Sequence, residues 1–483
     1  MIGREREISE LLNILESNKS EFVAVYGRRR VGKTYLIDET FRNYIVFRHT
    51  GLPPIYDTNN EVEEKRKLTR QLEAFYQTLK LYDCLESNDN MPTTWIEAFG
   101  ILTRAIKRKY DNKRIVLFID ELPWMDTPKS YFLEAFTHFW NNYCCFNHNI
   151  ILVVCGSSSS WILDNVIHSH GGLYGRVTFS LKLMPFNLKE TKEYLSSIGV
   201  NYSDYDVATA YMAVGGIPYY LSFFRRGLSL AQNFDNIFFN KQPLLGEEYE
   251  ELFSSQFTNH ERFKKIIEIL KEKKSGLSAK AISEKLDLSL NSNLYDMLRS
   301  LEKGSFIMTY NSFGEAKNER RYRLIDPFCL FYLNVVKDNI GKNKYWETYM
   351  DNQNLVVWKG LAFENVCFNH IDKIKEKLGI SWMATNELMW YQKPTDEQSG
   401  VQIDLLIERK DNIVNLCEAK YVISEYRMTK KDHLDLMDKM EILRSKLNKR
   451  ISIMNVLITT YGIRENEYSR DYVNVVTLDD LFK

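Results

Sequence analysis

The sequence predicts an α/β protein organised around a parallel sheet that is buried on both faces. Three short apolar runs carry this prediction, because a strand covered on both faces has a continuous hydrophobic sequence without polar alternation. A glycine-rich turn follows the first run, and a segment that can continue as a helix follows the turn. The three runs are Phe22–Tyr26, Ile115–Ile119 and Ile150–Cys155.

The glycine-rich turn reads GRRRVGKT from Gly27 to Thr34 and fits G-x-x-x-x-G-K-[ST], the pattern of a phosphate-binding loop. Backbone N–H groups and the positive end of the following helix dipole meet phosphate oxygens in such a loop. Gly27 and Gly32 shape the turn, Lys33 is expected to reach the β- and γ-phosphates, and Thr34 is expected to hold Mg²⁺. ATP or ADP with Mg²⁺ is therefore the predicted ligand. The alternative is a glycine turn before a surface helix.

The stretch from residue 51 to residue 100 is long for a simple connection between strands. Apolar residues from Leu68 to Leu81 recur there at near-helical spacing. We therefore expect additional helices between the strands of the sheet.

Polar residues follow the second and third apolar runs. Asp120 is expected to hold Mg²⁺ through water, and Glu121 to polarise the water that attacks the γ-phosphate. The third run ends in Gly156 and four serines, of which Ser157 or Ser158 is the candidate to sense the γ-phosphate. A serine-rich loop that caps the next helix is the alternative for either serine.

The middle of the chain, residues 255–330, predicts three helices and then two strands around a polar hairpin. This is the order of elements in a winged helix-turn-helix, and Ser278 is the expected N-cap of its second helix. The expected helices cover Phe263–Leu270, Ser278–Leu286 and Leu294–Leu301, and the expected strands cover Phe306–Tyr310 and Arg321–Leu324.

Basic residues of this segment offer phosphate contacts from two places. The third helix carries Arg299 and Lys303, and the hairpin carries four more cations, of which arginine grips phosphate well. The segment either contacts DNA in this way or serves as a spacer within the chain. The four hairpin cations are Lys317, Arg320, Arg321 and Arg323.

The C-terminal part carries a second group of functional candidates on a predicted β-hairpin. Side chains alternate along a strand, so Glu418 and Lys420 are expected on the same side, with Asp404 on the partner strand. A predicted helix upstream carries Glu364. The hairpin strands cover Gln402–Glu408 and Ile413–Lys420, the upstream helix covers Trp358–His370, and a helix over Lys430–Lys446 and a strand over Ile451–Thr459 follow.

The composition excludes several classes of protein. Lys and Arg together number 64, as do Asp and Glu, so no global field attracts nucleic acid and any such contact needs a local patch. Seven cysteines show no repeated metal-ligand spacing, which is typical of a reduced, cytoplasmic protein. The N-terminus does not read as a signal peptide, and no apolar run approaches the roughly 18 residues of a membrane helix.

The N-terminal half resembles an AAA+ ATPase of the STAND-related group widespread in archaea and bacteria. The resemblance rests on the phosphate loop, the Asp120–Glu121 strand end and three short segments in the right order. It implies an ATPase core over residues 1–185 and a helical lid over residues 186–245. It also makes Arg176 a candidate arginine finger, which would act on nucleotide in its own chain or in a neighbouring chain of a homo-oligomer. The alternative is that Arg176 is a helix-end arginine paired with a surface acid. The short segments are Ile2–Glu5, Gly175–Arg176 with Leu183–Phe186, and Gly215–Pro218.

Residues 345–483 resemble the PD-(D/E)xK restriction-endonuclease-like fold, which has an acid on a helix, then D, then E-x-K. By this resemblance Asp404 and Glu418 hold Mg²⁺ with the carbonyl of residue 419, and Lys420 orients or activates a water. Glu364 would support a second metal or hold Lys420. No proline precedes Asp404, which departs from the family pattern at a variable position.

These observations predict an ATP-hydrolysing protein that acts on DNA, with a metal-dependent nuclease domain. The alternative is an ATP-dependent regulatory switch or scaffold whose nuclease-like domain is catalytically silent. The intact Asp404, Glu418 and Lys420 set favours the first, whereas the zero net charge and a third helix with few basic residues favour the second.

Overall fold

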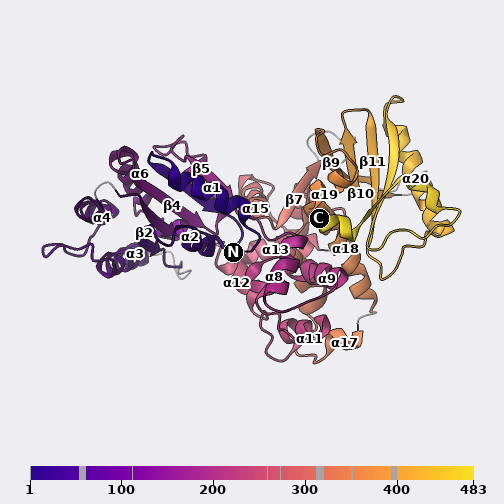
Figure 1. Ribbon diagram of the computed structural model, residues 1–483, viewed down its shortest axis with the longest axis horizontal. Helices are drawn as coiled ribbons and strands as arrows, with labels where there is room; N and C mark the ends of the chain where they lie inside the picture. Colours follow the sequence, from indigo (N-terminus) through magenta and orange to yellow (C-terminus); the bar gives the residue numbers. More distant parts are fainter. Residues whose placement is uncertain are drawn as a thin grey trace. The chain divides into compact units, whose positions relative to one another are not determined.

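The computed structural model describes residues 2–53, 61–110, 113–257, 259–271, 273–311, 320–349, 352–392 and 400–483. These residues form two compact units (Figure 1). Unit 1 comprises Met1–Met184 with Leu252–His260, and unit 2 comprises Pro185–Glu251 with Glu261–Lys483. None of the described helices is both long and apolar enough to span a membrane.

Unit 1 is built on a five-stranded sheet in the order β2-β3-β4-β1-β5, in which all neighbouring strands run parallel. Because the strands are parallel, their carboxyl ends meet at one edge, and the first strand lies between the fourth and the fifth. The strands are β1 (Glu21–Tyr26), β2 (Ile45–Thr50), β3 (Ile115–Asp120), β4 (Ile150–Gly156) and β5 (Phe179–Lys182). The three apolar runs are thus strands β1, β3 and β4, whose residues are almost all buried.

Helices of unit 1 pack on this sheet through an aromatic core. Phe75 of α3, Phe99 of α4 and Phe136 of α6 are buried together with apolar residues of the strands. Two helices do occupy the long stretch before β3, but Leu81 at the end of α3 is 80% exposed and is no part of the core. The helices are α1 (Glu5–Glu16), α2 (Lys33–Phe41), α3 (Glu61–Leu81), α4 (Trp95–Lys109), α5 (Leu122–Met125), α6 (Phe132–Asn142), η1 (Cys144–Phe146), α7 (Ser159–Ile162) and η2 (Leu163–Ile167).

Unit 2 begins with a run of short helices. Gly216 ends the turn after α9 with φ of 66°, and a Cβ there would lie 2.1 Å from the carbonyl oxygen of Phe186, so only glycine fits this approach. The helices are α8 (Leu188–Ser197), α9 (Asp204–Val214), α10 (Pro218–Leu221), α11 (Leu230–Phe234), η3 (Asp235–Phe239) and α12 (Glu248–Ser254), the last of which continues into unit 1.

The middle segment, residues 255–330, contains three helices and a small antiparallel sheet in the order β6-β8-β7. Ser278 caps α14 by accepting a hydrogen bond from the amide of Ala281, which confirms the predicted N-cap. The sequence did not indicate the two-residue strand β6. The elements are α13 (His260–Leu270), β6 (Leu277–Ser278), α14 (Ala279–Leu286), α15 (Ser292–Lys303), β7 (Ile307–Asn311) and β8 (Arg320–Leu324), followed by α16 (Pro327–Phe331), η4 (Tyr332–Val336) and α17 (Tyr345–Tyr349).

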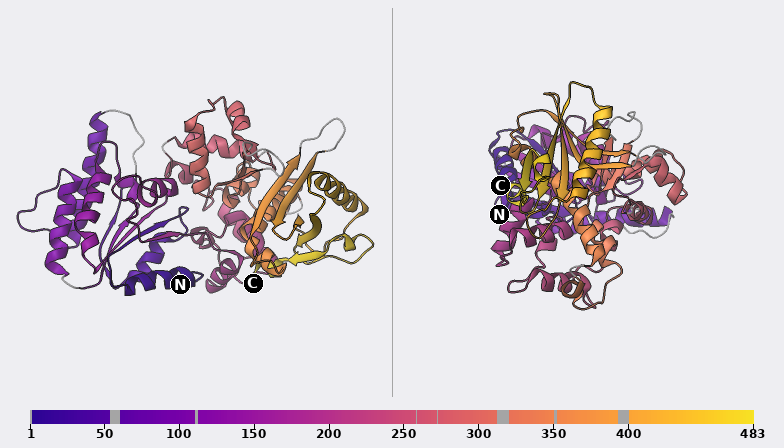
Figure 2. Two further views of the ribbon diagram at one scale, coloured as in Figure 1. Left: turned by 90° about the horizontal axis from the view of Figure 1, so that it is seen from above. Right: turned by 90° about the vertical axis from the view of Figure 1, so that its right-hand side faces the viewer.

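The C-terminal segment contains a second five-stranded sheet in the order β13-β12-β11-β10-β9, with β9, β10 and β11 antiparallel and β11, β12 and β13 parallel (Figures 1 and 2). The predicted helix over Lys430–Lys446 is observed with those bounds. The elements are α18 (Gln353–Asn369), α19 (Ile371–Lys377), β9 (Thr385–Gln392), β10 (Val401–Arg409), β11 (Ile413–Lys420), α20 (Lys430–Lys446), β12 (Ser452–Thr459), η5 (Ser469–Asp471), β13 (Asn474–Thr477) and α21 (Leu478–Leu481).

Contacts within unit 2 tie its first helices to the C-terminal segment. The Tyr421 hydroxyl donates a hydrogen bond to the Tyr205 carbonyl and lies 2.8 Å from the Thr209 hydroxyl of α9. The rings of Tyr421 and Tyr205 stack, with Tyr461 beside them. In addition, His370 Nε2 accepts a hydrogen bond from the amide of Leu188, at the start of α8. The 186–245 segment therefore packs on the strand that ends in Lys420 and on the end of α18.

Candidate functional site

The phosphate loop connects β1 to α2 in a conformation that requires its glycines. Gly27 has φ of 145°, and a Cβ there would lie 2.4 Å from the Leu183 carbonyl oxygen, while Gly32 is left-handed with φ of 93°. Lys33 is buried, and its ammonium donates to the carbonyl oxygens of Gly27 at 3.0 Å and Arg28 at 3.1 Å. The loop thus holds the lysine charge at its centre, beside the N-terminus of α2.

Arg4 also fixes the loop, a role that sequence reasoning missed. Its guanidinium is 4% exposed and donates to the Met184 carbonyl at 2.8 Å and the Val31 carbonyl at 3.3 Å. The resemblance had singled out the Ile2–Glu5 segment, but nothing in the sequence connects Arg4 with residues 27 and 180 positions away.

Asp120, at the end of β3, is held by three donors. The Thr34 hydroxyl donates to Oδ2 at 2.8 Å, and the Glu121 amide donates to Oδ1 at 2.9 Å. The buried Cys155 thiol of β4 also donates to Oδ1, at 2.6 Å. Burial raises the pKa of Cys155 well above its usual range, so the thiol keeps its proton and remains a donor.

Glu121 adopts a left-handed backbone, with φ of 46° and ψ of 47°, which is uncommon for a residue other than glycine. Its Oε2 accepts hydrogen bonds from both the amide and the hydroxyl of Ser157, each at 3.0 Å. Burial raises the pKa of Glu121, and the nearby Lys33 charge acts against this shift. The strand order therefore brings Glu121 and Ser157 together at the edge where the phosphate loop lies.

The residues at this edge fit a nucleotide-bound magnesium ion. Thr34 and Asp120 offer hydroxyl and carboxylate oxygens in mutual contact, and Mg²⁺ in nucleotide sites takes one or two such protein ligands together with phosphate and water oxygens. A cage of three protein ligands is not needed. In the described parts of the chain, no group of three or more His, Cys, Asp or Glu residues is arranged to hold a metal ion.

Arg176 lies on an exposed turn between η2 and β5, after Gly175 with φ of 64°. It is not at a helix end, and its guanidinium forms no ion pair with any described residue. The alternative of a helix-end arginine paired with a surface acid is therefore wrong for this structure.

In the C-terminal segment, the predicted site residues divide into two groups. Ile403 and Leu406 of β10 both belong to the core under α20, although regular alternation would place residues three apart on opposite faces. The strand is irregular between these two positions, as in a β-bulge, and Asp404 lies in the irregular stretch. Asp404 shares a cation with Glu364 of α18, whereas Glu418 pairs with α20 through Lys439.

The first group is an ion-pair cluster of Lys274, Arg323, Glu364 and Asp404. Lys274 Nζ lies 2.5 Å from Glu364 Oε1 and 2.9 Å from Asp404 Oδ1. Arg323 donates to the other Glu364 oxygen at 3.0 Å. Burial raises the pKa of Glu364 to about 7, and the Asp404 charge adds to the shift. Glu364 therefore contacts Lys274 and Arg323, not Lys420 as the sequence had allowed.

The second group lines a cavity of about 220 Å³ beside α20. Glu418 Oε1 lies 2.5 Å from Lys439 Nζ, and its Oε2 lies 4.0 Å from Lys420 Nζ. Glu418 and Lys420 thus lie on one side of β11, and burial, together with the Asp404 charge, raises the pKa of Glu418. Lys274 lies between Glu364 and Asp404, and Lys439 pairs with Glu418, so all three carboxylates are paired with cations. Their predicted role as a shared metal site stays a prediction.

The basic residues of the middle segment are less available for phosphate than the sequence indicated. Arg323 is 4% exposed within the ion-pair cluster. Arg321 donates to the carbonyls of Ser275 and Gly276, and its guanidinium lies over the Tyr391 ring. Lys317 lies outside the described residues. The remaining candidates are Arg320, which is exposed, and Arg299 and Lys303 on α15.

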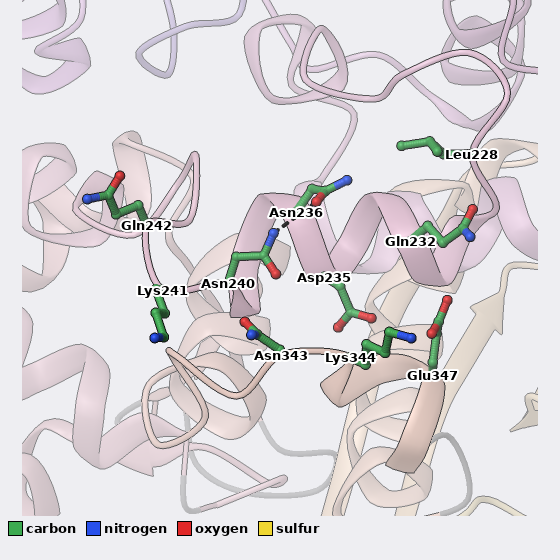
Figure 3. A pocket seen from close by; sticks show the side chains of 10 residues that line it. All are labelled: Leu228, Gln232, Asp235, Asn236, Asn240, Lys241, Gln242, Asn343, Lys344 and Glu347. Atoms are coloured by element: carbon green, nitrogen blue, oxygen red, sulfur yellow. Dashed lines mark hydrogen bonds between the residues drawn. The ribbon is translucent and has the colours of Figure 1, made fainter.

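An open polar pocket of about 920 Å³ in unit 2 has no link to either predicted site (Figure 3). Figure 3 shows Asp235 of η3 facing Lys344 and Glu347. Asp235 accepts the amide hydrogen of Trp346 at 2.9 Å and so caps α17. Two acids and two lysines line the pocket, which therefore favours neither cations nor anions.

Comparison with known proteins supports the assignment of unit 1. Residues 1–224 match the family model described as an ATPase domain predominantly from Archaea. An uncharacterized protein of Methanocaldococcus jannaschii is 24% identical over 449 residues, covering 92% of each chain. An uncharacterized ATP-binding protein of the same organism is 27% identical over 251 residues, which cover 45% of this chain and 67% of the relative.

Two solved structures are also similar. The Walker-type ATPase of Pyrococcus abyssi has a TM-score of 0.47 at 18% identity, over 69% of this chain and 96% of that one. The Aeropyrum pernix ORC2 protein has a TM-score of 0.41 at 13% identity, over 70% of this chain and 94% of that one. The phosphate loop and the parallel sheet around it agree with the match of residues 1–224 to this P-loop ATPase domain model.

Proposed function

We propose that the chain is an ATP-hydrolysing switch that acts on DNA. Its ATPase core (residues 1–185) and helical lid (186–245) would control a winged helix (255–330) and a nuclease-like domain (345–483). The observation that carries this proposal is the hydrogen-bonded series Thr34, Asp120, Glu121 and Ser157, which connects the phosphate loop to the ends of β3 and β4. A loop that only bound phosphate would not need the two acids at the end of β3 in this hydrogen-bonded series.

Each residue of this series has a chemical role. The amides around Gly27 and Gly32 and the Lys33 ammonium bind phosphate oxygens, while Thr34 and Asp120 hold Mg²⁺. The metal neutralises charge on the phosphates when it is bound. Glu121 accepts a hydrogen bond from the attacking water and so orients this water toward the γ-phosphate.

Ser157 connects recognition of the γ-phosphate to the position of Glu121. Both its amide and its hydroxyl donate to Glu121 Oε2, so a γ-phosphate that attracts either donor also repositions the carboxylate. This arrangement favours Ser157 over Ser158 as the sensor. Arg176, exposed on its turn, is the proposed arginine finger, acting in the same chain or across a homo-oligomer.

The ATPase proposal is tested by comparing two variants with wild type. Lys33→Ala should abolish measurable ATP binding in calorimetry, because the charge at the centre of the loop is lost. Glu121→Gln should bind ATP with wild-type affinity while its hydrolysis falls by about 10²–10⁴-fold, since the amide polarises water poorly. Equal hydrolysis by Glu121→Gln and wild type would show that another group activates the water.

Metal-dependent DNA cleavage by the C-terminal domain is the second candidate function. The observation that favours it is that buried Glu418 and half-buried Lys420 lie on one side of β11 and line the same cavity of about 220 Å³. Linear, circular and single-stranded DNA should be incubated with Mg²⁺ or Mn²⁺, with and without ATP. Cleavage that Lys420→Ala abolishes while ATP hydrolysis continues supports the nuclease, and its absence under every condition supports the silent scaffold.

A further inference from the structure

The three C-terminal carboxylates of the predicted metal site are all in contact with cations. Glu364, Asp404 and Glu418 are each at most 6% exposed, and all three are ion-paired. Four cations contact these three acids, so a divalent cation that binds the same carboxylates has to displace or compete with a cation that is already there. The four cations are Lys274, Arg323, Lys420 and Lys439.

Two of the four cations come from the middle segment. Lys274 lies in the turn between α13 and β6, and Arg323 lies on β8. Together they contact both oxygens of Glu364, and Lys274 also bridges to Asp404. Without these two cations, three carboxylates would face two lysines, and the group would carry a net negative charge.

We propose that Lys274 and Arg323 hold the C-terminal carboxylates in a closed state that excludes divalent metal. The winged-helix segment then regulates the nuclease-like site through ion pairs, and it does not use these two residues on DNA. This inference rests on the proposed nuclease function, because only a site meant to bind metal is regulated by excluding it.

Of the two cations, Lys274 is the one whose side chain can move away from the carboxylates. Its side chain is 37% exposed, whereas that of Arg323 is 4% exposed. An ammonium 2.5 Å from one carboxylate and 2.9 Å from another lies where a metal bridging the same oxygens would have to bind. When the Lys274 side chain moves away, Glu364 and Asp404 lose the cation that they share. Two buried carboxylates without a counterion are unstable, so a divalent ion can then bind between them.

The test measures metal binding by the full chain without nucleotide. Mn²⁺ is titrated into wild type, Lys274→Met and Lys273→Met, and bound Mn²⁺ is quantified by electron paramagnetic resonance. Lys273→Met is the control, because Lys273 is the exposed neighbour of Lys274. Lys274→Met should gain one site at least tenfold tighter than any that wild type shows in the C-terminal segment. The gain should disappear in Lys274→Met/Asp404→Asn and be absent in Lys273→Met. Equal Mn²⁺ binding by wild type and Lys274→Met overturns the proposal.

A measurement on wild type covers the case in which Lys274→Met does not fold. Excess Mn²⁺ should displace Lys274 and raise deuterium uptake in residues 273–278, and Asp404→Asn should not respond. Unchanged uptake in wild type with Mn²⁺ bound at the carboxylates also overturns the proposal. Failure of the nuclease function is distinguishable, since Lys274→Met would then bind Mn²⁺ and still cut no DNA.

Discussion

His370 should make the junction between α8 and α18 sensitive to acid. The side chain is 4% exposed, its Nδ1 lies 2.9 Å from the Val366 carbonyl, and its Nε2 accepts the amide hydrogen of Leu188. The ring is therefore neutral, with its proton on Nδ1. Protonation of Nε2 would replace the acceptor that Leu188 needs with a second donor.

The magnitude follows from the shift of the histidine pKa. Burial lowers the pKa of His370 from 6.5 to about 4. Because the folded pKa lies below the unfolded one, the stabilisation is complete above pH 6.5 and decreases as the pH falls toward 4. At pH 5 the linkage relation gives a loss of about 2 kcal/mol relative to pH 8.

Hydrogen exchange of the Leu188 amide measures this loss locally. After correction for intrinsic exchange rates, wild type should lose about 2 kcal/mol of protection between pH 8 and pH 5. His370→Gln keeps an acceptor and a donor but does not titrate, so it should lack this component. His138→Gln, at an exposed position of α6, should behave as wild type. The same pH dependence in wild type and His370→Gln would refute the reasoning.

Two further predictions concern the ATPase site. Cys155→Ala removes a donor to Asp120 and should weaken the Mg²⁺ dependence of ADP binding about fivefold, the equivalent of one hydrogen bond. Cys155→Ser restores a donor and should recover the wild-type value. Magnesium titrations of Cys155→Ala that coincide with those of wild type would contradict this prediction. Ser157→Ala should slow hydrolysis about tenfold at unchanged ATP affinity, because the hydroxyl is one of the two donors that hold Glu121. Ser158→Ala is the matched control, and a larger effect there would assign the sensor to Ser158.

Local patterns predicted the elements well because each pattern depends on neighbours in sequence. Continuous apolar runs marked β1, β3 and β4, and alternation with a turn marked the β10–β11 hairpin. Thr34 meets Asp120 because the phosphate loop is a recurring arrangement of strand, turn and helix.

Long-range contacts escaped prediction because they depend on register and packing. Cys155 meets Asp120 only because Ile119 pairs with Val154 across the parallel strands. The irregular stretch of β10 at Asp404 has no marker such as glycine or proline in the sequence, and it places Leu406 on the same core face as Ile403. Lys274 looks like any surface lysine until the fold brings it to an acid 90 residues away.

The hydrogen bonds of Tyr421 to Tyr205 and Thr209 limit where this chain can be divided into independent domains. Tyr421 directly follows Lys420, and its hydroxyl is hydrogen-bonded to the Tyr205 carbonyl and the Thr209 hydroxyl, both in α9. Likewise, the Leu188 amide donates to His370. Residues 345–483 expressed alone would expose these surfaces to solvent. Residues 345–483 are thus not an independent domain, and in domain exchange between relatives they should be transferred together with residues 186–245.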